Sequence, residues 1–126
     1  MKFKDDEHKH FFETLVTYAS SRNDPYRKAL FYTLGLTEQT RDHIHALYDF
    51  KNNCIDLDGL QKPWQTGTSM RVTRLAFNLY NGFAGSEGID DSERYTPYNL
   101  FDTGLMLYMF EAIILRYPSY ADLEEL

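Results

Sequence analysis

The segment from residue 63 to residue 83, PWQTGTSMRVTRLAFNLYNGF, contains residues whose types and spacing could bind an anion. A glycine flanked by hydroxyl side chains precedes a periodic apolar run, and free backbone N–H groups at a helix start can hold a phosphate or carboxylate. Arg71 and Arg74 share one helical face, which Asn78 and Asn81 extend. The candidate ligand-binding residues are Thr66, Thr68, Ser69, Arg71, Arg74, Asn78 and Asn81.

The same segment has a second interpretation, as an ordinary amphipathic helix. Hydroxyl residues at 66–69 would cap its start, and Asn81-Gly82 would end it. The polar line would then be a solvated surface opposite the apolar line. That apolar line consists of Val72, Leu75, Ala76, Leu79 and Phe83.

The histidines occur as two pairs whose members are two residues apart, namely His8 with His10 and His43 with His45. Residues two apart on a helix diverge by about 200°, so neither pair can chelate one ion. Glu7 with His10 and Asp42 with His45 have the spacing of half a di-metal carboxylate site. Residues 63–83 contain no acid for the other half, so we predict no metal site and expect exposed histidines.

Catalytic signatures are missing from the sequence. There is no G-x-S-x-G elbow, P-loop, dinucleotide fingerprint or H-E-x-x-H motif. Cys54 is the single cysteine, so no intramolecular disulfide can form, and a small buried hydrophobe is its expected role. We therefore predict no catalytic residue and no cofactor, which favours a non-catalytic protein over an enzyme.

The net charge of −6 is unevenly distributed. Residues 1–85 hold 11 Lys/Arg and 10 Asp/Glu, whereas residues 86–126 hold 2 and 9. Binding to duplex nucleic acid or to an anionic membrane needs a basic surface and is not expected. The acidic half indicates either solubility or a basic partner, and pairing of Lys62, Arg71 and Arg74 with that half would explain the basic cluster.

The length and hydropathy predict one domain over residues 1–126 and a cytoplasmic protein. The N-terminal ten residues lack the apolar segment of a secretory signal, and no apolar run is long enough to span a bilayer. A chain of this size can bury about two-thirds of its unfolded surface in one core.

Apolar periodicity predicts a mainly α fold, a single compact bundle of about five helices with a small β-hairpin near residues 49–60. The predicted helices cover residues of about 5–20, 24–35, 37–48, 66–81 and 99–116. Phe11, Leu15 and Tyr18, flanked by Phe12, Val16 and Ala19, form the apolar face of the first helix. Residues 84–97 are a polar loop by composition.

The last predicted helix is apolar on nearly all sides. A helix of this kind lies at the centre of a bundle or forms half of an interface, and a homodimer through it is one such interface. Tyr26, Ala29, Leu30, Thr33 and Leu34 form the expected buried stripe of the second helix.

Several stretches resemble a small family of uncharacterised proteins, a domain of unknown function from Gram-positive Firmicutes and their mobile elements. These stretches are Glu7-His8 with Phe11-Phe12, Tyr26 to Leu36, Ser69 to Gly82, Tyr95 to Phe101 and Phe110 to Pro118. The resemblance implies a compact helical fold and an intracellular bacterial or phage-type setting. It supplies no activity, cofactor or site residue.

The sequence supports two hypotheses of different classes. The first is a non-catalytic protein-interaction module, in a mobile-element setting an accessory or anti-defence factor that binds a host protein. The alternative is a binder of a small anion or nucleotide, or an enzyme, that uses the helix start and polar face of residues 66–81.

Overall fold

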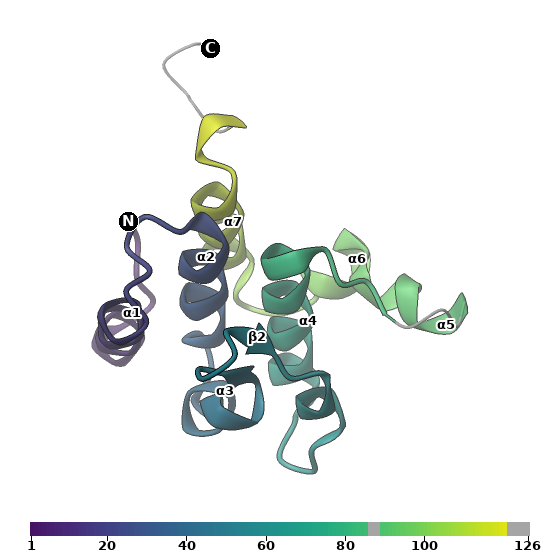
Figure 1. The fold of residues 1–126 in the computed structure, drawn as a ribbon. Helices are drawn as coiled ribbons and strands as arrows, with labels where there is room; N and C mark the ends of the chain where they lie inside the picture. The colour runs from purple at the N-terminus through teal and green to yellow at the C-terminus, as the bar shows by residue number, and fades with distance from the viewer. Residues whose placement is uncertain (86–88, 121–126) are drawn as a thin grey trace.

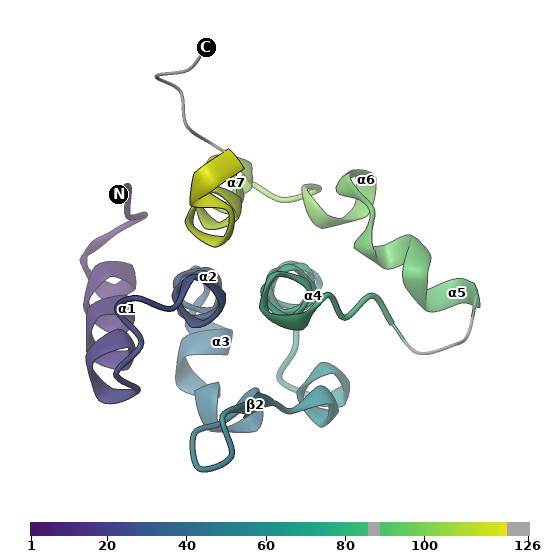
Figure 2. The same ribbon diagram turned by 45° about the horizontal axis from the view of Figure 1, so that its top comes forward.

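The chain folds as helices packed around one central helix. The computed structural model describes residues 1–85 and 89–120. The central helix is α2 (Pro25–Leu34), and three helices pack against it: α1 (Asp6–Tyr18), α4 (Gly67–Asn81) and α7 (Met106–Arg116). Figures 1 and 2 show these helices around α2, with α4 beside it. The mainly helical fold is thereby confirmed.

The sequence around α2 explains why this helix forms and why it is buried. The Asp24 carboxylate accepts hydrogen bonds from the backbone N–H groups of Tyr26 and Arg27, and Pro25 occupies the first turn. All residues from Ala29 to Leu34 are buried, so every face of the helix is covered. Tyr26, predicted in the buried stripe, is instead 45% exposed at the helix start.

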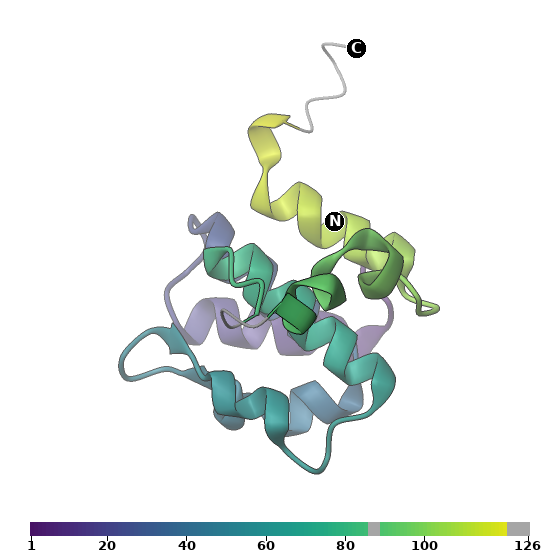
Figure 3. The ribbon, with the colours of Figure 1, turned by 90° about the vertical axis from the view of Figure 1, so that its right-hand side faces the viewer.

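The prediction of a last helix over residues 99–116 is wrong in its first part. A short helix, α6 (Pro97–Leu100), packs on α4, whereas α7 begins at Met106 and packs chiefly on α2. The chain turns between them because the Thr103 hydroxyl accepts the backbone N–H of Leu105. Only Met109 and Ala112 of α7 are fully buried, so this apolar helix lies at the edge of the bundle (Figure 3).

The helix predicted over residues 37–48 also ends early. α3 (Glu38–Asp42) is followed by a 3-10 turn, η1 (Ile44–Ala46), and then by the predicted hairpin of β1 (Tyr48–Asp49) and β2 (Cys54–Ile55). Its strands pair antiparallel, with Tyr48 opposite Ile55. The backbone carbonyl of Leu47 accepts the N–H of Asp56, so Leu47 bonds to the segment after the hairpin and does not continue the helix. Cys54, expected to be buried, is exposed in this hairpin.

The most deeply buried residues of α1 include the flanking residues Phe12 and Val16 of the predicted apolar face. His8, Phe12 and Val16 are buried, whereas Tyr18 is 72% exposed and lies edge-on to Phe50. His8 also differs from the prediction, since it was expected at the surface and has no exposed area.

The predicted polar loop over residues 84–97 contains helical turns. α5 (Ile89–Ser92) and η3 (Glu93–Tyr95) form one side of a cleft beside α4, while residues 86–88 lie outside the described part. Between the hairpin and α4 lies η2 (Leu57–Gln61), and η4 (Pro118–Tyr120) follows α7. None of the helices in the described ranges is both long and apolar enough to cross a bilayer.

Candidate functional site: a cleft beside α4

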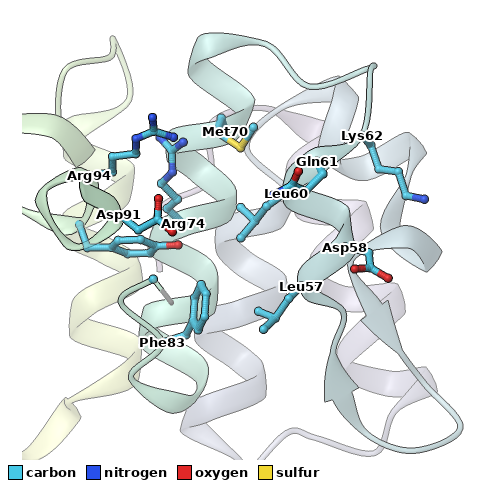
Figure 4. Close-up of a pocket in the computed structure, with 12 residues that line it drawn as sticks. Leu57, Asp58, Leu60, Gln61, Lys62, Met70, Arg74, Phe83, Asp91 and Arg94 are labelled. Atoms are coloured by element: carbon cyan, nitrogen blue, oxygen red, sulfur yellow. The ribbon is translucent and has the colours of Figure 1, made fainter. Parts of the chain in front are cut away.

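A cleft of about 730 Å³ lies between α4, η2 and the segment that carries α5 and η3. Figure 4 shows its side chains. The lining residues come from four separate parts of the chain: Leu57, Asp58, Leu60, Gln61, Lys62, Met70, Arg74, Phe83, Gly85, Asp91, Arg94 and Tyr95. The tertiary fold therefore builds this cavity, and no single motif contains it.

One end of the cleft holds two guanidinium groups. Arg74 comes from the half-buried flank of α4, and Arg94 is an exposed residue of η3. Both side chains line this end of the cleft (Figure 4), and both burial and the charge of Arg94 lower the pKa of Arg74. Neither guanidinium has a hydrogen bond or an ion pair with another described residue.

Asp91 also lines the cleft, and its charge raises the pKa of Arg74, which partly offsets the effect of the Arg94 charge. Among the described residues that line this end, two carry a guanidinium and one carries a carboxylate. Lys62 and Asp58 point away from the arginines at the far side of the cleft (Figure 4). The arginine end is thus a basic site within an acidic protein.

The rest of the lining combines apolar and aromatic side chains with the polar side chains of Asp58, Gln61 and Lys62. Phe83 and Tyr95 meet edge to face, with ring centroids 5.7 Å apart. Burial raises the pKa of Tyr95, which keeps its hydroxyl neutral. Leu57 and Leu60 of η2 form the opposite wall. A ligand that fits here would carry an anion at one end and an apolar group beside it.

A second hollow of about 420 Å³ begins at the arginine end. It shares Met70, Arg74 and Arg94 with the cleft. Its remaining lining residues are Gln65, Thr66, Gly67, Arg71 and Asn99, all with polar side chains or exposed backbone. The two arginines therefore line both hollows.

A family model described as a family of unknown function, DUF6075, matches residues 1–126. The chain belongs to this family. No curated protein and no solved structure matches it significantly. The DUF6075 family carries no assigned activity in its description, so the cleft is interpreted from its geometry alone.

The predicted hydroxyl residues of this DUF6075 chain serve the start of α4. Thr66 accepts the backbone N–H of Ser69, and the Ser69 hydroxyl accepts the N–H of Thr66 at 2.7 Å, a reciprocal capping box. Ser69 is buried and also donates to the Gln65 side chain, whereas Thr68 is exposed. Thr66 also lines the second hollow.

The predicted asparagines close the other end of α4. Asn78 donates to the backbone carbonyl of Phe83, and Asn81 accepts the Phe83 N–H. Gly82 adopts a left-handed conformation with φ 79° and ends the helix. Both amide side chains are therefore used in a turn away from the arginine end.

The two predicted arginines have different roles. Arg71 donates to the backbone carbonyls of Asn99, at 2.9 Å, and Gly67, and lies 3.8 Å from the Asp102 carboxylate. The ion pair of Arg71 with Asp102 joins the basic cluster to the acidic half of the DUF6075 chain. Arg74 alone of the predicted set faces the cleft without a hydrogen-bond partner in the described residues.

The sequence analysis did not identify Arg94, which lines the cleft together with Arg74. Residues 86–126 contain two Lys/Arg residues, and Arg94 is one of them. The rarity of cationic side chains in this half of the sequence was a signal that could have marked Arg94 as a candidate binding residue. The wall residues Leu57, Leu60, Phe83 and Tyr95 gave no such signal, because apolar residues occur along the whole DUF6075 chain.

The histidine and acid pairs do not form a metal site in the described residues, which contain no group of three or more His, Cys, Asp or Glu that could hold an ion. Glu7 pairs with Arg41 at 3.0 Å, and His10 and Asp42 line a separate hollow beside α1. His43 stacks on Trp64, with ring centroids 4.2 Å apart.

Proposed function

We propose that this protein is a non-catalytic interaction module that holds an acidic side chain of a partner protein between Arg74 and Arg94. The observation that carries this proposal is that two guanidiniums line one end of the cleft and repel each other, and neither is bonded to a described residue. A carboxylate placed there relieves their repulsion and forms charge-assisted hydrogen bonds.

The shape of the cleft supports a peptide segment as the occupant. The cleft is open along one side of the molecule, and its exposed lining residues include Leu57, 44% exposed, and Arg94. A partner segment can lie along such a groove with one acidic side chain directed at the arginines. An acidic partner segment would approach an otherwise acidic protein at its basic spot.

The setting of this interaction is part of the proposal. We place it in the cytoplasm, and the resemblance to proteins of Firmicutes and their mobile elements makes a host or defence protein the partner class. In that setting the protein would be an accessory or anti-defence factor that acts by binding.

The test uses two mixtures of acetylated, amidated heptapeptides with varied neighbours, one with Glu and one with Gln at the centre. Binding is followed by the amide NMR signals of the whole protein. We expect saturable shifts at residues 74 and 94 with the Glu mixture and a loss of affinity of about tenfold or more with the Gln mixture. No binding of the Glu mixture would overturn the proposal.

Variants assign the binding to the arginine end. Arg74→Gln and Arg94→Gln should each weaken the Glu mixture about tenfold, whereas Lys62→Gln, a matched loss of charge at the far side, should leave it unchanged. The alternative function, a small-anion or nucleotide binder, is measured in parallel with inorganic phosphate and ATP. If phosphate or ATP binds more tightly than the Glu mixture, the ligand of the cleft is a small anion and not a peptide segment.

A second contact is supported by α7. Its outer side exposes Met106, Leu107, Phe110, Ile114 and Tyr117. Exposed apolar side chains gathered on one helix are typical of contact surfaces, so we propose self-association through this helix. A helix of this length offers a small area, and the association should therefore be weak. A monomer mass by light scattering at millimolar protein concentration would exclude it.

A further inference from the structure

We infer that residues 2–4 form a strap that His8 holds closed over α2, and that protonation of His8 releases the strap. The strap runs from the start of α1 towards α7, as Figure 2 shows. None of residues 2–4, 8 and 32 lines the arginine cleft, so the device is separate from the proposed binding site.

The first residue of the strap contacts both α2 and α7. The Tyr32 hydroxyl donates a hydrogen bond to the backbone carbonyl of Lys2. The backbone N–H of Lys2 lies 3.4 Å from a carboxylate oxygen of Glu111, and its ammonium lies 5.9 Å from the centroid of the Tyr108 ring. The strap therefore bridges two helices that are distant from it in the sequence.

The other two residues of the strap contact the imidazole of His8. The Phe3 ring meets the imidazole edge-on, with ring centroids 5.3 Å apart, and it also packs on Phe12 and Tyr32. The backbone N–H of Lys4 donates to His8 Nδ1 at 3.1 Å. His8 has no exposed area, and the strap is part of what covers it.

The Nδ1 contact requires a neutral imidazole. In the neutral ring Nε2 carries the proton and donates to the Tyr32 carbonyl at 2.7 Å, which leaves Nδ1 as the acceptor for Lys4. A second proton would occupy Nδ1, so that two N–H groups would face each other at 3.1 Å. The bond to Tyr32 survives because Nε2 remains a donor. Acid therefore breaks the contact with the strap and keeps the contact with α2.

The groups around His8 keep it neutral at pH 7. Burial lowers its pKa from the ordinary value of 6.5, and the hydrogen bond to Tyr32 and the charge of Asp5 oppose this effect. The charges of Arg41 and Lys4 lower the pKa as well.

The remaining charged groups near the strap have other partners. Glu7 of α1 pairs with Arg41 of α3 at 3.0 Å, and Glu111 of α7 lies beside Lys2. Burial and, to a smaller extent, the charge of Glu111 raise the pKa of Tyr32, so its hydroxyl stays a donor. Among these groups, His8 is the one whose type ordinarily titrates near neutral pH.

Release of the strap should be local. Lys2 and Lys4 are exposed, whereas α2 is covered by α1, α4 and α7. Opening costs least where few buried contacts break, so the strap opens before the bundle does. Its release uncovers the rings of Phe12 on α1 and Tyr32 on α2, which creates an apolar surface in acid.

An NMR titration of the whole protein from pH 8 to pH 4 tests this inference. The imidazole nitrogen signals report the protonation of His8, the amide signals of residues 2–4 report the strap, and those of residues 72–79 report the bundle. We expect the strap signals to move to unfolded-chain positions with the midpoint of His8, while the bundle signals stay in place. Glu111→Gln, which removes the other titrating partner of the strap, should leave this midpoint unchanged.

Three variants assign the release to the Nδ1 contact. His8→Asn places an oxygen where Nδ1 lies and cannot titrate, so its strap should stay closed throughout. His8→Gln reaches the position of Nε2 and offers Lys4 no acceptor, so its strap should be open at pH 8. Tyr32→Phe removes the bond to Lys2 and should raise the midpoint by about 0.5–1 pH unit, because a weaker strap opposes protonation less.

The wild-type titration decides the matter even where a His8 variant does not fold. Strap signals that stay in place while His8 titrates would overturn the inference, and so would a His8 that stays neutral down to pH 4. Loss of the bundle signals together with the strap signals would show that acid unfolds the whole chain instead. A midpoint that Glu111→Gln shifts would identify that carboxylate as the trigger and reject His8.

Discussion

The imidazole of His8 donates a hydrogen bond from Nε2 to the backbone carbonyl oxygen of Tyr32, 2.7 Å away, in the interior of the protein. Its Nδ1 accepts the backbone N–H of Lys4 at 3.1 Å. Both ring nitrogens are thus paired by a neutral imidazole that carries its proton on Nε2. Gly35 allows this contact, because a Cβ there would lie 2.7 Å from the His8 ring.

Acid should destabilise the protein through His8. Burial lowers the pKa of His8 below the ordinary value of 6.5, with smaller opposing effects from Tyr32 and Asp5. Below pH 6.5 the unfolded chain therefore binds the proton more readily than the folded one, and the free energy of unfolding falls as the pH falls. Above that pH this contribution to stability is fully present.

Urea unfolding at intervals between pH 5 and 8 measures this effect. For one proton the slope can reach about 1.4 kcal/mol per pH unit. The His8→Gln variant keeps a donor for the Tyr32 carbonyl but cannot titrate, so it should be less stable at pH 8 and show a smaller slope. A variant with the wild-type slope would show that the pH dependence comes from other groups.

The Thr66→Ala substitution should lower the free energy of unfolding by about 1 kcal/mol, because it removes the side-chain oxygen that caps the Ser69 N–H. Thermal or urea denaturation provides the measurement. Thr68→Ala is the matched control, since this exposed residue lies in the same turn and should change stability by less than about 0.5 kcal/mol. Equal effects of both changes would contradict the capping role.

Gly59→Ala should be strongly destabilising. A Cβ at this position would lie 2.5 Å from the Leu47 side chain and 2.6 Å from the backbone oxygen of Ala46, so backbone would have to move. We expect a loss of about 1–3 kcal/mol, as for overpacked cores. Gly104→Ala is the control, because nothing lies within 4 Å of its added Cβ. A stable Gly59→Ala protein would show that η2 does not pack closely on residues 46–47.

The contact of Arg71 with α6 should depend on hydrogen bonds more than on charge. Asp102→Asn removes the partner of a long, largely exposed ion pair and should cost less than about 0.5 kcal/mol. Arg71→Ala removes the donors to the Asn99 and Gly67 carbonyls and should cost about 1–2 kcal/mol. Urea unfolding of both variants checks the order, and a larger effect of Asp102→Asn would reverse the assignment.

Local signals predicted most of the helix starts. The helices predicted over residues 24–35 and 37–48 begin at their first residues, where the Asp24 carboxylate and the Thr37 hydroxyl accept backbone N–H groups. Such caps depend on residues within one turn, which is why sequence alone suffices for them. The hairpin near residues 49–60 was predicted by the same local reasoning.

Helix ends and the choice of the central helix were harder to predict. The apolar pattern left the last helix either at the centre of the bundle or in an interface, and in the structure α2 is buried on every side and α7 on one. Periodicity measures how much of a helix is apolar, and it contains no information about how many neighbours the fold provides. The break before α7 likewise depends on α6 packing against α4.

Of the candidate site, the sequence by itself determined the helix of residues 67–81, its caps and the helical face that carries Arg71 and Arg74. Only the tertiary structure decided which side chains remained for binding. It used Thr66, Ser69, Asn78 and Asn81 in local hydrogen bonds and brought Arg94 beside Arg74. Contacts within a turn follow from neighbouring residues, whereas a cleft between distant segments follows from the packing of the whole chain.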